Sequence, residues 1–312
     1  MKFSLREEWR EDRLLDVLTE EERGLRLIVS RVGAELISLA RRTSDGNWTG
    51  FLYRDNDISM PAKGWGNHAT VMGYYLHRIK DERSVYRGRE IRGGTHSFLR
   101  SKTWQRVQSP NNGALTYRIT PNDFSTTEYP LKVSLDLTYQ IENEKLRVAF
   151  RFKNHEPELS AHVGFGLHPG FGATTFEAFH FEMPRGTYRR HFSPGNYLTG
   201  ETQDIEITGG EMPFPKDKLS GSFILELLQV HGGKFTYSDP PSGRSVILDL
   251  NNVPYLTLWS DGGPFLCVEP CWGLTDHHEQ RHFEDKQGIH EIAAGGELRA
   301  DFTIEPQLDV AS

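Results

Sequence analysis

Cysteine is scarce in this chain of 312 residues, which excludes a disulfide-stabilised fold. Its two cysteines, Cys267 and Cys271, lie on one short segment and have no second pair with which to complete a metal site. The lack of a disulfide framework is consistent with a reducing compartment, so we expect a cytoplasmic location.

Long apolar runs, basic runs and internal repeats are lacking as well. No run is long enough to span a bilayer, and the first eight residues turn acidic without the apolar core of a signal peptide. The 36 lysines and arginines are spread along a chain of net charge −7. The sequence therefore has no run of basic residues of the kind that binds the phosphate backbone of a nucleic acid. We expect neither a nucleic-acid nor a membrane partner, and nothing indicates the oligomeric state.

The apolar residues that are present recur with a period of two, which is typical of half-buried strands. One such hairpin is predicted on either side of a turn at Glu142–Glu144, and another break falls at Gly33-Ala34. The alternating runs are Leu25–Val29, Leu36–Leu39, Leu131–Tyr139, Leu146–Phe152 and Leu298–Ile304. These runs predict a protein made mainly of β-strands.

Helices have little room in a chain with 30 glycines and 16 prolines. The best helix candidates are Glu11–Glu22 and a short segment at Lys216–Leu228. Many short strands with frequent turns favour an all-β sandwich or barrel. No linker divides the chain, so we expect a single domain over residues 1–312. Within it, residues 1–24 form an N-terminal extension and residues 25–305 the β-sandwich.

Three segments place a titratable side chain where a ligand has room to approach. His96 lies in Gly93–Phe98, and His168 lies among glycines and before a proline in Gly164–Phe171. Glu269 ends an apolar run that begins at Phe265. Taken alone, such a histidine is more often a structural hydrogen-bonder, and such a glutamate is usually a solvated strand end. His277-His278, with Asp276 and His282, has no known ligand spacing, so we interpret it as a polar loop and expect no metal.

In their order along the chain, these motifs resemble the aldose 1-epimerase family of the galactose mutarotase-like superfamily. The closest likeness is to the branch with His-Gly-Phe and Glu-Pro-Trp motifs, and it runs from about residue 25 to 305. The motifs that carry it are Met72–Ile79, Thr95–Arg100 with Trp104, Gly166–Phe171, Ser242–Arg244, Phe265–Asp276 and Lys286–Glu297. The resemblance implies a large antiparallel β-supersandwich that acts on a small-molecule sugar without a metal or cofactor.

The resemblance also implies a mutarotase reaction, in which the α and β anomers of a hexose interconvert through ring opening. His168 would be the general acid that protonates the ring oxygen. Glu269 would be the base that takes the proton of the anomeric hydroxyl. His96 and Arg78 would bind sugar hydroxyls or the ring oxygen.

Further sugar contacts implied by the resemblance rest on weaker matches. The family uses an aspartate ahead of the Ser-Gly-Arg turn, and the nearest match is Asp217, which lacks the usual neighbouring histidine. His77 stands where the family has asparagine and adds a polar group of its own. Ser97 replaces a glycine after His96, which would crowd the pocket. Trp272 is a further candidate contact, although aromatic residues here, Trp259 and Phe265 included, most often belong to the core.

Three other functions stay open at this point. A glycosidase needs two carboxylates across one bond, and the sequence offers one strong candidate. A non-catalytic sugar-binding protein would have no need of both His168 and Glu269. A hexose-6-phosphate epimerase would want basic residues at the pocket mouth, and the arginines near the His96 motif are Arg83, Arg87, Arg89, Arg92 and Arg100.

Overall fold

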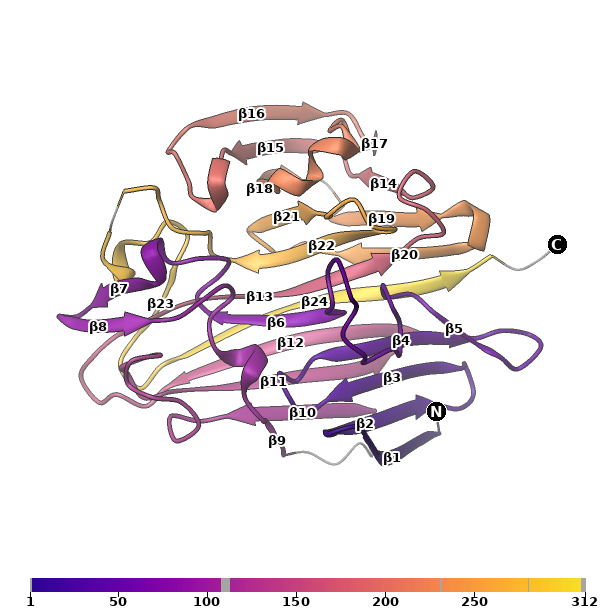
Figure 1. The fold of residues 1–312 in the computed structure, drawn as a ribbon, viewed down its shortest axis with the longest axis horizontal. Coiled ribbons are helices and arrows are strands. Elements are labelled where there is room, and N and C mark those ends of the chain that lie inside the picture. The colour runs from indigo at the N-terminus through magenta and orange to yellow at the C-terminus, as the bar shows by residue number, and fades with distance from the viewer. Residues whose placement is uncertain (1, 108–112, 231, 280, 310–312) are drawn as a thin grey trace.

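The computed structural model describes residues 2–107, 113–230, 232–279 and 281–309 (Figure 1). Three sheets of five, nine and eight strands dominate it, and a two-stranded hairpin lies beside them. In the described part of the chain, the ladders that join the named strands are antiparallel. The prediction of an all-β, antiparallel architecture is confirmed.

The N-terminal sheet joins neighbours along the chain, in the order β1 (Phe3–Arg10), β2 (Arg13–Glu20), β3 (Leu25–Ser30), β4 (Leu36–Arg42) and β5 (Trp48–Gly50). The helix predicted over Glu11–Glu22 is therefore wrong. Strand β2 is buried on both faces: Leu15 and Val17 face one cluster while Leu18 faces another. Apolar residues on both sides of a strand imitate helical spacing. The expected boundary at residue 24 falls within this sheet, at the turn between β2 and β3.

The nine-stranded back sheet contains the predicted hairpin. Its strands, in spatial order, are β17 (Gly210–Glu211), β14 (His180–Met183), β19 (Lys234–Asp239), β20 (Arg244–Asp249), β24 (Glu297–Leu308), β12 (Lys145–Asn154), β11 (Val133–Glu142), β10 (Ala114–Ile119) and β9 (Gln105–Arg106). Strands β11 and β12 are joined by Asn143 and Glu144, which both have positive φ. Two such residues form the turn whose twist matches a hairpin.

The eight-stranded sheet is called the central sheet here. Its path runs β16 (Thr202–Ile207), β15 (Gly186–His191), β18 (Phe223–Val230), β21 (Tyr255–Trp259), β22 (Phe265–Trp272), β13 (Ala161–Gly172) and β23 (His290–Ile292), and β6 (Ala69–Tyr74) also pairs with β13. Figure 1 shows β6, β13 and β22 side by side near the middle of the molecule. The hairpin of β7 (Arg83–Tyr86) and β8 (Arg89–Arg92) projects at one end.

The helical segments of the described chain are short 3-10 turns. They are η1 (Lys80–Glu82), η2 (Leu99–Ser101), η4 (Pro194–Asn196), η5 (Lys216–Gly221), η6 (Pro240–Ser242) and η7 (Phe283–Asp285). Of the helix predicted over Lys216–Leu228, only η5 is helical, and β18 takes the rest. Within the described residues, none of the helices has the length and apolar character of a membrane-crossing segment.

The core lies between the central and back sheets. Phe150 and Phe152 of β12 meet Phe165 of β13, with ring centroids 5.2 and 4.8 Å apart. The same hydrophobic cluster reaches Leu18 and Leu39 of the N-terminal sheet, so all three sheets share it. This two-layer packing holds β13 and β22 in a fixed register, which the site depends on.

Candidate active site

A row of polar side chains crosses the middle of the central sheet. Thr70 of β6 lies opposite His168 of β13, and Thr257 of β21 lies opposite Glu269 of β22. The register between β13 and β22 places His168 and Glu269 opposite one another as well. Their side chains meet, with Nε2 of His168 3.2 Å from Oε1 of Glu269. Two residues from separate motifs thus form one buried pair.

Strand alternation decides which neighbours of Glu269 join this row. Side chains two apart share a face of a strand, whereas side chains three apart lie on opposite faces. Trp272 is three positions after Glu269, is 4% exposed, and stacks on Phe165 with ring centroids 5.1 Å apart. The structure therefore puts Trp272 in the core, behind the sheet, and not at the site as a sugar contact.

The row opens into a cavity of about 300 Å³. Two tryptophans form one wall: Trp65 stacks on the His168 ring at 5.2 Å, and Trp259 approaches it edge-on at 5.9 Å. The lining residues are Trp65, Asn67, Thr70, His77, Arg78, Thr95, His96, Arg100, His168, Ser193, Asn196, Ser222, Ile224, Trp259, Glu269 and Thr275. A polar floor with an aromatic wall suits a hydroxylated ring, which has both polar groups and an apolar face.

Two connected loops bring His77, Arg78 and His96 to this cavity. The backbone N–H of His96 donates to the carbonyl oxygen of His77 over 2.7 Å, and Nη1 of Arg78 donates to Oγ1 of Thr95 over 2.8 Å. His77, His96 and Ser97 all have positive φ, between 51° and 66°. Residues other than glycine rarely adopt this conformation, and such strain clusters at functional sites. The left-handed backbone at Ser97 also accounts for the glycine that the resemblance leads one to expect there.

A buried ion pair anchors the loop that carries His77 and Arg78. The Asp276 carboxylate pairs with Lys286, and both side chains are buried. The carboxylate also accepts the backbone N–H of Lys80 over 2.7 Å, while the backbone N–H of Asp276 donates to the carbonyl oxygen of Arg78 over 3.1 Å. Asp276, which the sequence places in a polar loop, thus stabilises the loop that carries His77 and Arg78.

Burial opposes charge on the titratable side chains of the cavity. It lowers the pKa of His168 to about 3 and the pKa of His77 to about 4, with neighbouring positive or protonated groups adding to the effect. Burial also holds the pKa of His96 well below its usual range and the pKa of Glu269 well above. Opposite pKa shifts in two groups in contact, here His168 and Glu269, are typical of an acid–base pair.

Several of these groups have polar atoms that the protein leaves unsatisfied. In the described part of the chain, Nδ1 of His96, Nδ1 of His168, Oε2 of Glu269 and Oγ1 of Thr70 have no hydrogen-bond partner. A buried polar atom without a hydrogen bond costs about 1–3 kcal/mol. Four such atoms around one cavity favour a polar ligand that would satisfy them.

Other sequence candidates lie away from the cavity. The side chain of Asp217, on η5, is 71% exposed and pairs with Lys218, so the structure does not bring it to the site. The aspartate that does contact the Ser-Gly-Arg turn is Asp239, which accepts hydrogen bonds from Ser242 and Arg244. Four of the five arginines near the His96 motif lie outside the lining, and only Arg100 contributes to it.

Sequence reasoning missed most of the cavity walls. Trp65 and Asn67 precede β6, whereas Ser193 and Asn196 follow β15, more than a hundred positions later. Trp65 carries a usable signal, because Gly64 and Gly66 flank it as glycines flank His168. Ser193 and Asn196 carry no such sequence signal, since serine and asparagine are common in surface turns.

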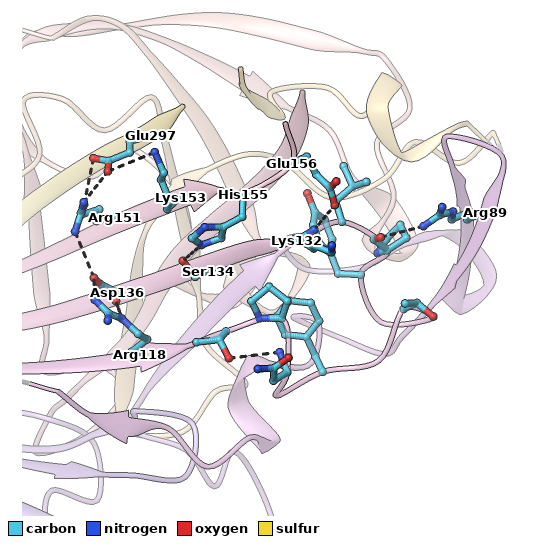
Figure 2. Close-up of a pocket in the computed structure, with 18 residues that line it drawn as sticks. Arg89, Arg118, Lys132, Ser134, Asp136, Arg151, Lys153, His155, Glu156 and Glu297 are labelled. Atoms are coloured by element: carbon cyan, nitrogen blue, oxygen red, sulfur yellow. Dashed lines mark hydrogen bonds and ion pairs between the residues drawn. The ribbon is translucent and has the colours of Figure 1, made fainter. Parts of the chain in front are cut away.

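A larger cavity, of about 900 Å³, lies on the outer face of the back sheet (Figure 2). Two of its arginines pair with carboxylates: Arg118 makes two hydrogen bonds to Asp136, and Arg151 makes two to Glu297. Neither His168 nor Glu269 reaches it. The smaller cavity is therefore the candidate active site, because it holds the perturbed and unsatisfied groups.

Comparison with known proteins identifies the family and the fold of the chain. The model of the family described as aldose 1-epimerase matches residues 16–271. The structure resembles a galactose mutarotase related enzyme from Lactobacillus acidophilus, with a TM-score of 0.83, 23% identity, and coverage of 95% of this chain and 99% of that one. Among curated proteins, no sequence matches.

Two further solved structures share the fold. A galactose mutarotase-like protein from Lactobacillus casei has a TM-score of 0.79 and 22% identity, covering 93% of this chain and 100% of its own. Galactose 1-epimerase from Lactobacillus acidophilus has a TM-score of 0.70 and 13% identity, covering 98% of this chain and 99% of its own. The fold is thus that of the galactose mutarotase-like proteins.

Proposed function

Because the chain belongs to the aldose 1-epimerase family, we propose that it interconverts the α and β anomers of an aldohexose by acid–base ring opening. The observation that carries the proposal is the contact between His168 and Glu269, 3.2 Å apart on the floor of a polar cavity. The pair combines a proton donor and a proton acceptor at the same sugar ring, which is what the reaction needs.

The chemistry follows from one proton shared by this pair. In the tautomer that starts the reaction, His168 carries the proton and Glu269 is a carboxylate. Glu269 takes the proton of the anomeric hydroxyl while His168 gives its proton to the ring oxygen. The bond from C1 to the ring oxygen breaks and the C1 carbonyl forms.

Ring closure reverses these transfers after the carbonyl turns over. In the open-chain state Glu269 is protonated and His168 is neutral, which is the tautomer that burial favours in both residues. Burial therefore makes His168 a stronger acid and Glu269 a stronger base than either is in water.

Four lining side chains support binding in this proposal. Arg78, held by Thr95, and His96 would donate hydrogen bonds to sugar oxygens. Trp65 and Trp259 would pack against the apolar face of the ring.

The test uses His168→Asn and Glu269→Gln, with polarimetry of freshly dissolved α-glucose or α-galactose. We expect each variant to lose about 100- to 10,000-fold in kcat, because each removes one arm of acid–base catalysis. The surface pair His180 and Glu211, 3.3 Å apart, supplies the matched controls His180→Asn and Glu211→Gln, which should keep parental rates. A parental rate in either site variant would contradict the proposal, and a parental protein without activity would favour a sugar-binding role.

The substrate is best tested by comparing galactose, glucose and glucose 6-phosphate. An unphosphorylated hexose is favoured, because Arg83, Arg87, Arg89 and Arg92 lie outside the cavity. Among the residues that the structure describes, only Arg78 and Arg100 bring fixed positive charge to its lining. A kcat/KM at least tenfold higher for glucose 6-phosphate, lost in Arg100→Met, would support the phosphosugar alternative instead.

A further inference from the structure

Three chemically different donor groups meet beside the cavity; His77 and Glu269 line it, and Cys271 is buried next to them. A ring nitrogen of His77, a carboxylate oxygen of Glu269 and the sulfur of Cys271 all lie within 4.8 Å of one another. Glu269 and Cys271 are two positions apart on β22 and so share a face, while His77 approaches from the loop after β6. Their convergence results from the sheet register and not from a sequence motif.

One carboxylate oxygen of Glu269 is left without a hydrogen bond from the described residues. Oε1 contacts His168, whereas Oε2 has no hydrogen-bond partner among the described residues, and Glu269 is only 1% exposed. Nδ1 of His77 lies 3.9 Å from Oε2. An unsatisfied, buried carboxylate oxygen directed at a histidine and a thiol has the chemistry of a ligand set for a cation.

We propose that His77, Glu269 and Cys271 bind a Zn²⁺ ion, which blocks the cavity. Imidazole nitrogen, carboxylate oxygen and thiolate sulfur are the three protein ligands of Zn²⁺, which binds them at about 2.0–2.3 Å. Three ligands leave a fourth tetrahedral position for water. The mixture of one sulfur with nitrogen and oxygen favours Zn²⁺ over Mg²⁺ or Ca²⁺, which prefer oxygen alone.

Neighbouring groups already orient two of the ligands. Oγ1 of Thr257 lies 3.5 Å from Nε2 of His77, which leaves Nδ1 on the side of Glu269. His168 contacts Oε1 of Glu269 and leaves Oε2 for the ion. Such contacts around the ligands commonly fix their orientation in metal sites.

Binding of the ion would inhibit the enzyme. A carboxylate held by Zn²⁺ no longer accepts a proton from a sugar, and the ion would occupy space between His77 and Glu269, which both line the cavity. This consequence rests on the proposed function, whereas binding of the ion rests on geometry alone.

The chain contains a matched control for the sulfur ligand. Cys267 is also buried, lies on the same face of the same strand four positions before Cys271, and is not part of the cluster. Isothermal titration of the purified, reduced protein with ZnCl₂ should show one site per chain. Cys271→Ser should weaken that site at least tenfold, as should His77→Gln, while Cys267→Ser keeps the parental affinity.

Co²⁺ provides a spectroscopic readout that does not depend on catalysis. The parental protein and Cys267→Ser should show visible bands of tetrahedral Co²⁺ and a sulfur-to-cobalt charge-transfer band, and Cys271→Ser should lack the latter. Parental Zn²⁺ affinity in Cys271→Ser, or equal losses in both cysteine variants, would overturn the site. If Zn²⁺ binds as expected but leaves mutarotation unchanged, the inhibitory part is wrong; if the protein has no mutarotation to inhibit, the failure lies in the proposed function.

Discussion

The pKa values of His168 and Glu269 shift in opposite directions because the same burial acts on groups of opposite charge. Burial disfavours imidazolium, which lowers the pKa of His168, and disfavours carboxylate, which raises the pKa of Glu269. The pair therefore keeps one proton over a broad pH range, with titration steps that belong to the pair and not to either residue.

This proton sets the expected pH profile. A second proton is bound only near the lowered pKa of His168, about 3, and the shared proton leaves only above the raised pKa of Glu269. We expect kcat/KM to stay level as pH falls through 6.5, the ordinary histidine pKa, and its acid limb to lie below pH 5. Stopped-flow polarimetry, with circular dichroism to verify folding at each pH, measures this. An acid limb near pH 6.5 in folded protein would show that His168 titrates like an exposed histidine.

At the scale of the element, β13 works as a support because its site-facing positions include glycines. Gly166 lies opposite Cys271 of β22, and a Cβ there would lie 2.4 Å from the carbonyl oxygen of Pro270. A Cβ on Gly170 would lie 2.3 Å from the ring of Trp65. The glycines before and after His168 thus let β22 and Trp65 approach on the two sides of that residue.

Gly166→Ala tests this close approach. The added methyl group would push β22 away from β13 and separate His168 from Glu269. We expect kcat/KM to fall by about 100-fold, as for a displacement of about 1 Å, and stability to fall by about 1–3 kcal/mol. Urea titration and polarimetry give the two quantities. The control is Gly221→Ala, where a Cβ would meet no atom within 4 Å, and it should change neither. A fully active Gly166→Ala protein would show that the register tolerates the extra atom.

At the scale of the whole molecule, a buried carboxylate joins the N-terminal sheet to the back sheet. Asp16 of β2 is 0% exposed and accepts hydrogen bonds from Arg31 and from the hydroxyl group of Tyr117 on β10. Arg106 of β9 also lies 3.3 Å from it. None of these residues lines the cavity, so the connection stabilises the scaffold without contacting substrate.

Asp16→Ala should therefore separate stability from activity. Removing the carboxylate leaves the buried hydroxyl group of Tyr117 without its acceptor, and Arg31 and Arg106 keep only the exposed Glu7 as an acidic partner among the described residues. We expect a loss of about 3 kcal/mol in the free energy of unfolding. Below the unfolding transition, kcat and KM should stay within twofold of the parental values. Asp12→Ala, at the exposed turn of the same hairpin, is the control and should leave the urea midpoint unchanged. An unchanged midpoint in Asp16→Ala would mean that the two sheets are held by apolar contacts alone.

The sequence by itself determined the features that depend on near neighbours. Period two predicted strands over Leu131–Tyr139 and Leu146–Phe152, and the structure has them at Val133–Glu142 and Lys145–Asn154. The order of the motifs along the chain, through the family resemblance, singled out His168 and Glu269, whose local surroundings alone favoured structural roles. The strand signal is local, because alternation is a property of a few consecutive residues.

Only the tertiary structure decided which of these residues meet. The segment Glu11–Glu22, predicted as a helix, contains strand β2 in the structure, because a second hydrophobic cluster covers the other face of that strand. The tertiary structure put Trp272 in the core and Asp217 in solvent, and it brought in Trp65 and Ser193 from distant loops. The physical reason is that sheet register and layer packing act between residues far apart in sequence, where no local pattern records which face will be covered.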